Sequence, residues 1–242
     1  MTLIETAGLV AGPKGIPAVR GLDLTVEAGE IVALLGPNGA GKSVTLATLA
    51  GVLPVIDGLV EVLGQPVDGH SVHAIARRGL AYLADDRGLF TQLTAAQNLR
   101  LYHHRASVVP VERAVGYFPQ LDRHLATKVG LLSGGEQQML ALACQLAADP
   151  RVLMIDELSH GLAPLVVESI LDTLRQIVAE TGIGVLLVEQ SLDHALTVAD
   201  RAYLLSSGEL LASGTAAELR AAGDVIEAAY LGSLGTAPTD QR

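Results

Sequence analysis

Short apolar runs alternate along the chain with stretches in which apolar residues recur every three or four positions. The runs are rich in β-branched and aliphatic residues and predict buried strands: Leu22–Val26, Ile31–Leu35, Leu80–Leu83, Val152–Ile155, Val185–Val188 and Ala202–Leu205. The other stretches predict helices: Lys42–Ala50, Ser133–Ala148, Pro164–Ala179 and Leu192–Ala199. Strands that alternate with helices indicate βαβ units and a mainly parallel sheet, and so an α/β fold.

One long stretch breaks this alternation. From Thr94 to Ala148 the pattern is helical and contains no convincing strand, so we expect a helical insert in the α/β core. The last residues, Gly232–Arg242, are small and polar, which predicts a loose tail. No run of about 18 apolar residues, the length needed to cross a bilayer, is present.

Composition narrows the class of protein. Half of the 242 residues are apolar but only 3% are aromatic, so the core must consist of aliphatic side chains, which suits a buried parallel sheet. The formal net charge of −10 argues against binding to nucleic acid, which needs a basic surface. Cys144 is the single cysteine, so no intramolecular disulfide can form.

A glycine-rich loop follows the strand Ile31–Leu35 and opens the next helix. It matches G-x-x-x-x-G-K-[ST] in full, in the strand–loop–helix context that makes this motif credible. Its backbone N–H groups are expected to surround the phosphates of ATP, with Lys42 at the β- and γ-phosphates and Ser43 on Mg²⁺. The alternative is an ordinary glycine-rich turn before a helix. The loop residues are Gly36, Pro37, Asn38, Gly39, Ala40, Gly41, Lys42 and Ser43.

Two adjacent carboxylates, Asp156 and Glu157, end the strand Val152–Ile155. The carboxyl end of a parallel strand is where such sheets bind ligands. Asp156 is expected to hold Mg²⁺, and Glu157 is expected to polarise the water that attacks the γ-phosphate. The alternative is a solvated pair at the start of a loop.

A second anion site is predicted at the start of the helix after Leu132. Ser133 and Glu136 form a capping box, and Gly134 and Gly135 bare the backbone N–H groups between them. The alternative is a helix cap without further function. The full string, LSGGEQQ, resembles the signature of the ABC ATPase family, and the resemblance extends over nearly the whole chain, to about Gly214.

The resemblance implies a RecA-like P-loop NTPase core with a mainly parallel sheet, an antiparallel N-terminal β part and a helical ABC subdomain. The core would comprise about residues 1–85 and 150–214, the subdomain about 86–149, and a C-terminal tail about 215–242. Two ATPase subunits would pack head to tail with ATP and Mg²⁺ between them, each signature capping the partner's γ-phosphate. The resemblance also implies a peripheral place on the cytoplasmic face of the membrane, permease subunits on other chains, a substrate-binding protein acting indirectly, and no nucleic acid.

Further family positions fall on identifiable residues. Asp85 occupies the Q-loop position, with an implied catalytic and Mg²⁺-binding role, and Gln190 occupies the switch-histidine position. Residues 159–162 form the D-loop. The strings LVEQ, ending at Gln190, and GLAP, ending at Pro164, are similar to those of the second ATPase subunit of branched-chain amino-acid importers. Amide and urea importers share these strings, so the substrate stays open.

The chain departs from the family pattern at several places. Pro13 stands where an adenine-stacking aromatic is expected, and Val44, within the predicted nucleotide site, lacks the usual hydroxyl. Leu158 replaces a proline, His160 an apolar D-loop residue and Cys144 an arginine. These changes predict weak nucleotide affinity. They favour a heterodimer with a different ATPase, although a homodimer remains open.

Some residues receive a plain structural interpretation. His103 and His104 are expected on a solvated face, Cys144 in the core, and His160 either at the partner chain or as a tolerated substitution. The main rival function is an ATP-gated module with weak or no turnover of its own. An ABC protein that acts on DNA or the ribosome, or an unrelated P-loop kinase or GTPase, fits the motifs less well.

Overall fold

The computed structural model describes residues 1–67, 72–103 and 111–223. The strands are β1 (Thr2–Ala11), β2 (Val19–Glu27), β3 (Ile31–Leu35), β4 (Val55–Val62), β5 (Gln65–Pro66), β6 (Leu80–Leu83), β7 (Val152–Asp156), β8 (Gly184–Glu189), β9 (Arg201–Ser206) and β10 (Glu209–Thr215). The α-helices are α1 (Lys42–Leu49), α2 (Val72–Arg77), α3 (Ala95–Tyr102), α4 (Val111–Gly116), α5 (Gly134–Ala147), α6 (Pro164–Thr181), α7 (Leu192–Val198) and α8 (Ala216–Ala221). Short 3₁₀ turns span Pro13–Gly15, Pro119–His124 and Val129–Leu131.

The larger sheet has six strands in the order β10-β9-β3-β8-β7-β6. Strands β9, β3, β8, β7 and β6 run parallel, and β10 pairs antiparallel with β9. This confirms the predicted α/β fold with a mainly parallel sheet. Five of the six strands predicted from apolar runs lie here, and the glycine-rich loop leaves the sheet from β3, between β8 and β9.

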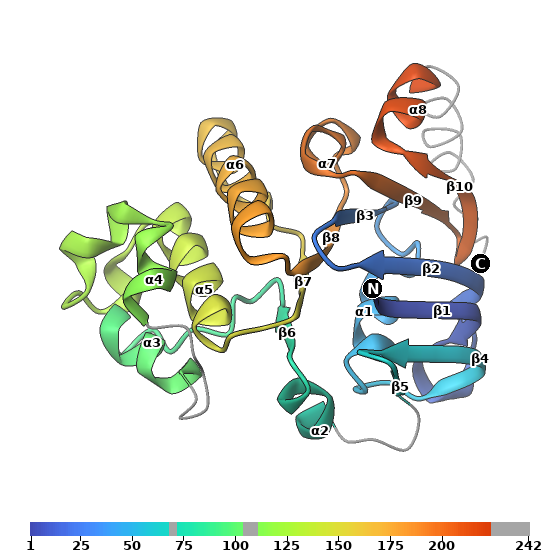
Figure 1. The fold of residues 1–242 in the computed structure, drawn as a ribbon, viewed down its shortest axis with the longest axis horizontal. Coiled ribbons are helices and arrows are strands. Elements are labelled where there is room, and N and C mark those ends of the chain that lie inside the picture. Colours follow the sequence, from blue (N-terminus) through green and yellow to red (C-terminus); the bar gives the residue numbers. More distant parts are fainter. Residues whose placement is uncertain (68–71, 104–110, 224–242) are drawn as a thin grey trace, which may run out of the picture.

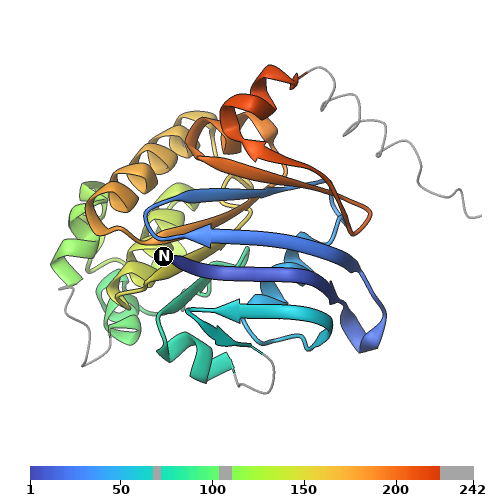
Figure 2. The same ribbon diagram turned by 45° about the vertical axis from the view of Figure 1, so that its right-hand side comes forward.

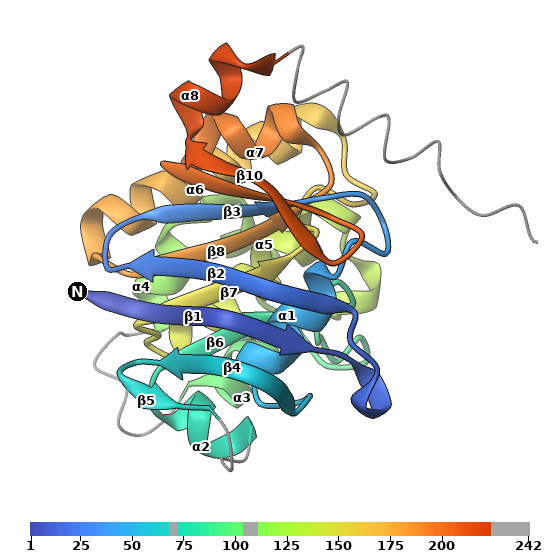
Figure 3. The same ribbon diagram turned by 90° about the vertical axis from the view of Figure 1, so that its right-hand side faces the viewer.

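The smaller sheet is antiparallel, in the order β2-β1-β4-β5, and is the predicted N-terminal β part. The run Leu22–Val26 belongs to β2. Neither β1 nor β4 was predicted as a strand, because only some of their side chains are buried; in β4, Ile56 and Leu59 are exposed. Figure 3 looks onto this sheet from outside, and in Figure 2 its blue and cyan strands lie in front of the green to orange helices.

The alternation of side chains in β3 divides the core in two. Ile31, Ala33 and Leu35 belong to a cluster shared with helices α3 to α7. Val32 and Leu34 belong to a second cluster, which is shared with the antiparallel sheet and α1. The central strand is therefore buried on both faces, which explains its uninterrupted apolar sequence.

Helices α3, α4 and α5 gather on one side of the molecule, away from the antiparallel sheet (Figure 1). Between Thr94 and Ala148 the described residues form helices and turns, with one isolated bridge from Thr94 to Lys128. That bears out the predicted absence of a strand here. The division of the chain into a RecA-like core, a helical subdomain and a C-terminal tail remains a prediction. Gly232–Arg242 and His104 lie outside the described residues. No helix in the described part of the chain is long and apolar enough to cross a membrane.

Candidate active site

The phosphate loop joins the carboxyl end of β3 to the first residue of α1. Gly41 lies in the left-handed region with φ = 105°, a conformation that glycine adopts readily. A Cβ atom on Gly36 would lie 2.6 Å from the carbonyl oxygen of Leu205. Glycine is therefore required at both positions to let the chain turn tightly past β9 and enter the helix.

Lys42 is held inside the loop and is only 4% exposed. Its Nζ donates hydrogen bonds to the carbonyl oxygens of Gly36, at 2.7 Å, and Pro37, at 3.2 Å. Burial lowers the pKa of Lys42, and the nearby carboxylates of Glu157 and Asp156 oppose that shift. The loop thus holds one ammonium group at the start of α1, where the helix dipole also favours an anion, and this suits a phosphate chain.

Asp156 is buried at the end of β7, 7% exposed. Its Oδ2 accepts a hydrogen bond from the Tyr82 hydroxyl at 3.4 Å, while its Oδ1 is buried without a hydrogen-bond partner among the described residues. Burial raises the pKa of Asp156, and the Ser43 hydroxyl opposes the rise. A buried carboxylate oxygen without a donor, beside a serine hydroxyl, fits the oxygen ligands that Mg²⁺ prefers. Ser43 and Asp156, two of the three residues predicted to bind Mg²⁺, therefore suit it.

Glu157 points away from the strand because its backbone adopts φ = 49°, in the left-handed region that non-glycine residues rarely enter. Its N–H donates to the carbonyl oxygen of Val188 at 2.9 Å. One carboxylate oxygen, Oε1, lies 3.9 Å from Nζ of Lys42. The other, Oε2, lies 3.7 Å from Nδ1 of His160. The side chain is 24% exposed and so borders both the loop and solvent.

Asp85 lies just after β6, and its Oδ1 is 3.1 Å from Nδ1 of His160. The structure therefore brings Asp85, Glu157 and His160 into one cluster, with ligand atoms all within 4.8 Å of one another. Sequence reasoning left His160 undecided between a partner contact and a neutral substitution. Gln190 follows β8 directly and is exposed.

Sequence reasoning missed Glu189, the last residue of β8. It is 2% exposed and accepts hydrogen bonds from the Ser159 N–H, at 2.9 Å, and the Ser159 hydroxyl, at 2.7 Å. Burial raises its pKa, and the bonds from Ser159 oppose the rise. Glu189 thereby ties the D-loop to the strand that precedes Gln190. A charged residue at the end of the apolar run VLLVE could have revealed it.

The capping box at the start of α5 is present as predicted. The Ser133 N–H and hydroxyl donate to Oε2 of Glu136 at 2.9 and 2.8 Å, and the Glu136 N–H donates back to the hydroxyl at 3.3 Å. A Cβ atom on Gly135 would lie 2.8 Å from Cγ1 of Val166, so α6 packs closely against this turn. Arg87, in the loop after Asp85, donates to the Gln138 side chain at 2.7 Å.

The structure shows the surroundings of the remaining residues that differ from the family pattern. Pro13 begins the exposed 3₁₀ turn between β1 and β2, and Val44 packs half-buried against the second core cluster. Leu158 is fully buried. Cys144 is also buried, and burial raises the pKa of its thiol to about 12, so it is a small apolar side chain as predicted. His103 is exposed, as expected for a solvated face.

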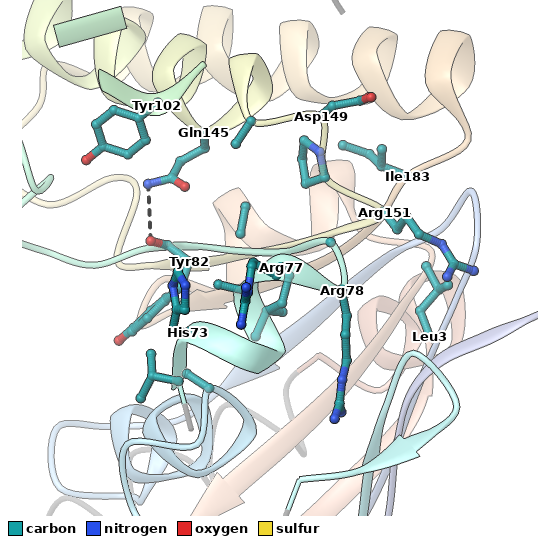
Figure 4. Close-up of a pocket in the computed structure, with 18 of the residues that line it drawn as sticks. Leu3, His73, Arg77, Arg78, Tyr82, Tyr102, Gln145, Asp149, Arg151 and Ile183 are labelled. Carbon is teal, nitrogen blue, oxygen red and sulfur yellow. Dashed lines mark hydrogen bonds between the residues drawn. The ribbon is translucent and has the colours of Figure 1, made fainter. Parts of the chain in front are cut away.

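A separate cleft of about 1310 Å³ opens at the other end of the parallel strands. It lies between α2 and the ends of α3 and α5. Its lining includes Gly79, Arg151 and Ile183, which directly precede β6, β7 and β8. Figure 4 shows Tyr82 and Gln145 on its walls, where the Gln145 amide donates to the Tyr82 carbonyl oxygen at 3.2 Å.

A family model described as ABC transporter matches residues 19–160. The chain belongs to the ABC transporter family. It is an ATPase of the ABC type, and its phosphate loop, strand-end carboxylates and signature are the sequence features that point to this family. Its architecture matches a nucleotide-free ATP-binding cassette from an ABC transporter with a TM-score of 0.82 at 21% identity, covering 94% of this chain and 98% of that chain.

Among curated relatives, this ABC ATPase is 37% identical to the high-affinity branched-chain amino acid transport ATP-binding protein BraG of Pseudomonas aeruginosa, over 90% of this chain and 94% of that protein. It is 35% identical to the probable branched-chain amino acid transport ATP-binding protein LivF of Archaeoglobus fulgidus, with the same coverage. It is also 34% identical to the lipopolysaccharide export system ATP-binding protein LptB of Escherichia coli, over 90% of this chain and 93% of that protein. The chain is thus similar both to proteins named for branched-chain amino acid transport and to one named for lipopolysaccharide export.

Proposed function

We propose that this ABC ATPase powers the import of branched-chain or other small amino acids or amides through separate permease subunits at the cytoplasmic face of the membrane. The observation that carries the hydrolytic part is the position of Glu157. Its carboxylate lies 3.9 Å from the buried Lys42 ammonium group. A base beside the phosphate-binding cation is where an attacking water would need to be polarised.

Each residue of the site has a proposed task. Lys42 binds the β- and γ-phosphates, and Ser43 and Asp156 would hold Mg²⁺, which neutralises phosphate charge when bound. Glu157 accepts the proton of the attacking water. Asp85 and Gln190 border the γ-phosphate and orient that water. Glu189, through its bonds to Ser159, keeps the D-loop in register with the strand before Gln190.

The site is completed by a second ATPase subunit. The N–H groups of Gly134 and Gly135 stand at the start of α5, and Figure 1 shows that this helix lies away from α1 and the antiparallel sheet. We propose that they cap the γ-phosphate bound by the partner's phosphate loop, with the helix dipole adding partial positive charge. Each ATP would then be enclosed between two chains.

The cleft between α2, α3 and α5 is the proposed docking surface for a permease helix. Its lining includes the exposed apolar side chains of Met1, Val52, Val72 and Leu101. Arg77, Arg78 and Arg151 add positive charge, and Figure 4 shows their side chains around the same opening. We expect a short permease helix with an apolar face and acidic flanks, because exposed apolar surface of this kind marks interaction sites.

Docking can be tested with charge substitutions. Leu101→Glu should abolish co-purification with the cognate permease, while Leu59→Glu, at an equally exposed leucine on β4, should leave it intact. Equal recovery of permease with both variants would contradict the proposed surface.

The substrate class rests on kinship and on two strings. BraG and LivF carry branched-chain amino-acid transport in their names, whereas LptB is named for lipopolysaccharide export. The strings LVEQ and GLAP favour the importer branch. In membrane vesicles that contain this chain with its permeases and binding protein, we expect uptake of labelled leucine that requires ATP. ATP-dependent uptake of urea or short amides without leucine would shift the substrate and keep the importer.

Hydrolysis is tested by Glu157→Gln. The amide cannot accept the water's proton, so turnover should fall on the order of 10²–10⁴-fold, the usual contribution of one acid–base group. ATP binding should persist, because Lys42 and the loop are unchanged. A variant that hydrolyses ATP like the parent would remove Glu157 from its proposed role.

A second candidate is an ATP-gated module with little turnover of its own in a heterodimeric ATPase. The observation that favours it is the composition of the predicted nucleotide site. Val44 offers no hydroxyl, and the exposed Pro13 offers no aromatic face. If the parent chain binds ATP but turns over no faster than Glu157→Gln, alone and with its partner, this second function holds.

A further inference from the structure

Three segments meet at the Asp85–Glu157–His160 cluster. Asp85 follows β6, Glu157 follows β7, and His160 lies in the D-loop. Nδ1 of His160 is 3.1 Å from Oδ1 of Asp85 and 3.7 Å from Oε2 of Glu157. Of the three residues predicted to bind Mg²⁺, Asp85 belongs to this cluster, whereas Ser43 and Asp156 do not.

The spacing of these donor atoms suits a small tetrahedral ion. Bonds of about 2.0–2.1 Å from Zn²⁺ to nitrogen and oxygen place tetrahedral ligand atoms roughly 3.4 Å apart. The two separations from Nδ1, 3.1 and 3.7 Å, lie on either side of that value. All three donors fall within 4.8 Å of one another, so small side-chain rotations would bring them onto one ion.

The ligand types select the class of ion. One imidazole nitrogen with two carboxylate oxygens suits zinc and neighbouring transition metals, whereas Mg²⁺ takes oxygen ligands and water. The side chains of His160 and Asp85 are 66% and 56% exposed, so an ion can enter from solvent and complete its coordination with water.

The surrounding charge also favours a cation. The carboxylates of Asp85, Asp156 and Glu157 lie close enough to interact electrostatically. Lys42 is the cation that opposes them, but it faces Oε1 of Glu157 at 3.9 Å. The ion would use Oε2, so the two oxygens of Glu157 serve different neighbours.

We propose that Asp85, Glu157 and His160 form a binding site for a transition-metal ion of the zinc class, which withdraws Glu157 from ATP hydrolysis. The inhibitory half rests on the proposed role of Glu157, whereas the metal site itself does not. Occupation of the site would occupy Oε2 of Glu157 and hold the D-loop to Asp85. Hydrolysis would resume when the ion is removed.

In the binding test, the chain is first freed of metal with a chelator. Zinc chloride is then titrated into it without nucleotide, and binding is measured by calorimetry. His160→Leu and Asp85→Asn each remove one ligand and should weaken Zn²⁺ binding by about tenfold or more. Mutation of a residue that only supports a metal ligand already costs about tenfold in metal affinity, so loss of a ligand should cost at least as much. His73→Ala, which removes an exposed histidine on α2, should bind like the parent. Equal affinity in the parent and both cluster variants, or no binding by the parent, overturns the site.

The activity test compares Zn²⁺ inhibition of MgATP hydrolysis in the parent and in His160→Leu. Inhibition should require a markedly higher Zn²⁺ concentration in His160→Leu, and a chelator should restore the parent's rate. Identical inhibition curves overturn the inhibitory half. If the chain shows no hydrolysis at all, the proposed function fails while calorimetry still decides whether the metal site exists.

Discussion

At the scale of single residues, the predicted nucleotide site of this chain is better equipped for the phosphates than for the base. Lys42, Asp156 and Glu157 form a close electrostatic group at the phosphate end. Pro13, which is predicted to lie beside the adenine base, begins a short turn in which Lys14 takes φ = 54°. A pyrrolidine ring offers apolar contact but no π face for adenine. The phosphates, and not the base, should therefore supply most of the binding energy.

From this we predict poor discrimination among ATP, GTP and CTP. Pro13→Tyr should tighten ATP by about 1 kcal/mol or more, the scale of base–aromatic stacking, as measured by nucleotide titration. Pro13→Leu is the matched control, since it also removes the proline but adds no aromatic ring. Strong native preference for ATP, or an equal gain in both variants, would show that another group holds the base.

At the scale of elements, α5 combines a helix cap with the signature. Glu136 accepts hydrogen bonds from the Ser133 N–H and hydroxyl and lies 2.9 Å from Nε2 of His124. The backbone bond from Ser133 is the main reason why the pKa of Glu136 is lowered from 4.5. The folded state thus favours the charged form of Glu136, which stabilises the first turn of α5.

The pH dependence follows from the direction of this shift. A carboxyl group with a lowered folded pKa contributes stability above its unfolded pKa, near 4.5, and loses it as the pH falls through the folded value. Glu136→Gln should therefore reduce the free energy of unfolding at pH 7 by about 0.5–1 kcal/mol, with the difference shrinking in acid. Denaturant titrations across pH measure this, and a difference that stays constant below pH 4 would contradict it.

At the scale of the whole molecule, the departures collect on one half-site. Pro13, Val44 and Asp85 are all predicted to lie in the nucleotide site around this chain's own phosphate loop, whereas the signature from Ser133 to Glu136 matches the family pattern. A chain that keeps the signature but lacks residues expected to bind its own nucleotide suits a partner whose nucleotide-binding residues are complete. We therefore favour a heterodimer with a different ATPase subunit.

The heterodimer prediction is tested with the Glu157→Gln chain alone, which should trap bound ATP. On a sizing column with saturating MgATP we expect a monomer, and we expect the parent to hydrolyse ATP slowly without its partner. Addition of the partner subunit should produce a dimer and restore turnover. A stable homodimer at low micromolar protein, with a parent that reaches full rate unaided, would rule out the requirement for a different partner.

Features that depend on a few consecutive residues could be predicted from the sequence. The phosphate loop, the Asp156–Glu157 strand end and the capping box at Ser133 are local patterns whose chemistry comes from backbone N–H groups and adjacent side chains. Buried strands such as β3 and β8 were also predictable, because both of their faces are apolar. Strands β1, β4 and β10 were not, because exposed polar positions interrupt their apolar pattern.

The fold, in contrast, was needed to show which distant side chains meet. His160 and Asp85 are 75 positions apart, Glu189 and Ser159 are 30 apart, and Arg87 and Gln138 are 51 apart. Each contact joins a loop to another loop, strand or helix that is distant in the sequence, so it depends on the strand order β8-β7-β6 and on how the helices pack beside it. Sequence spacing carries no information on that order. The sequence therefore could not show that His160 lies beside Asp85, because the parallel sheet brings the two loops together.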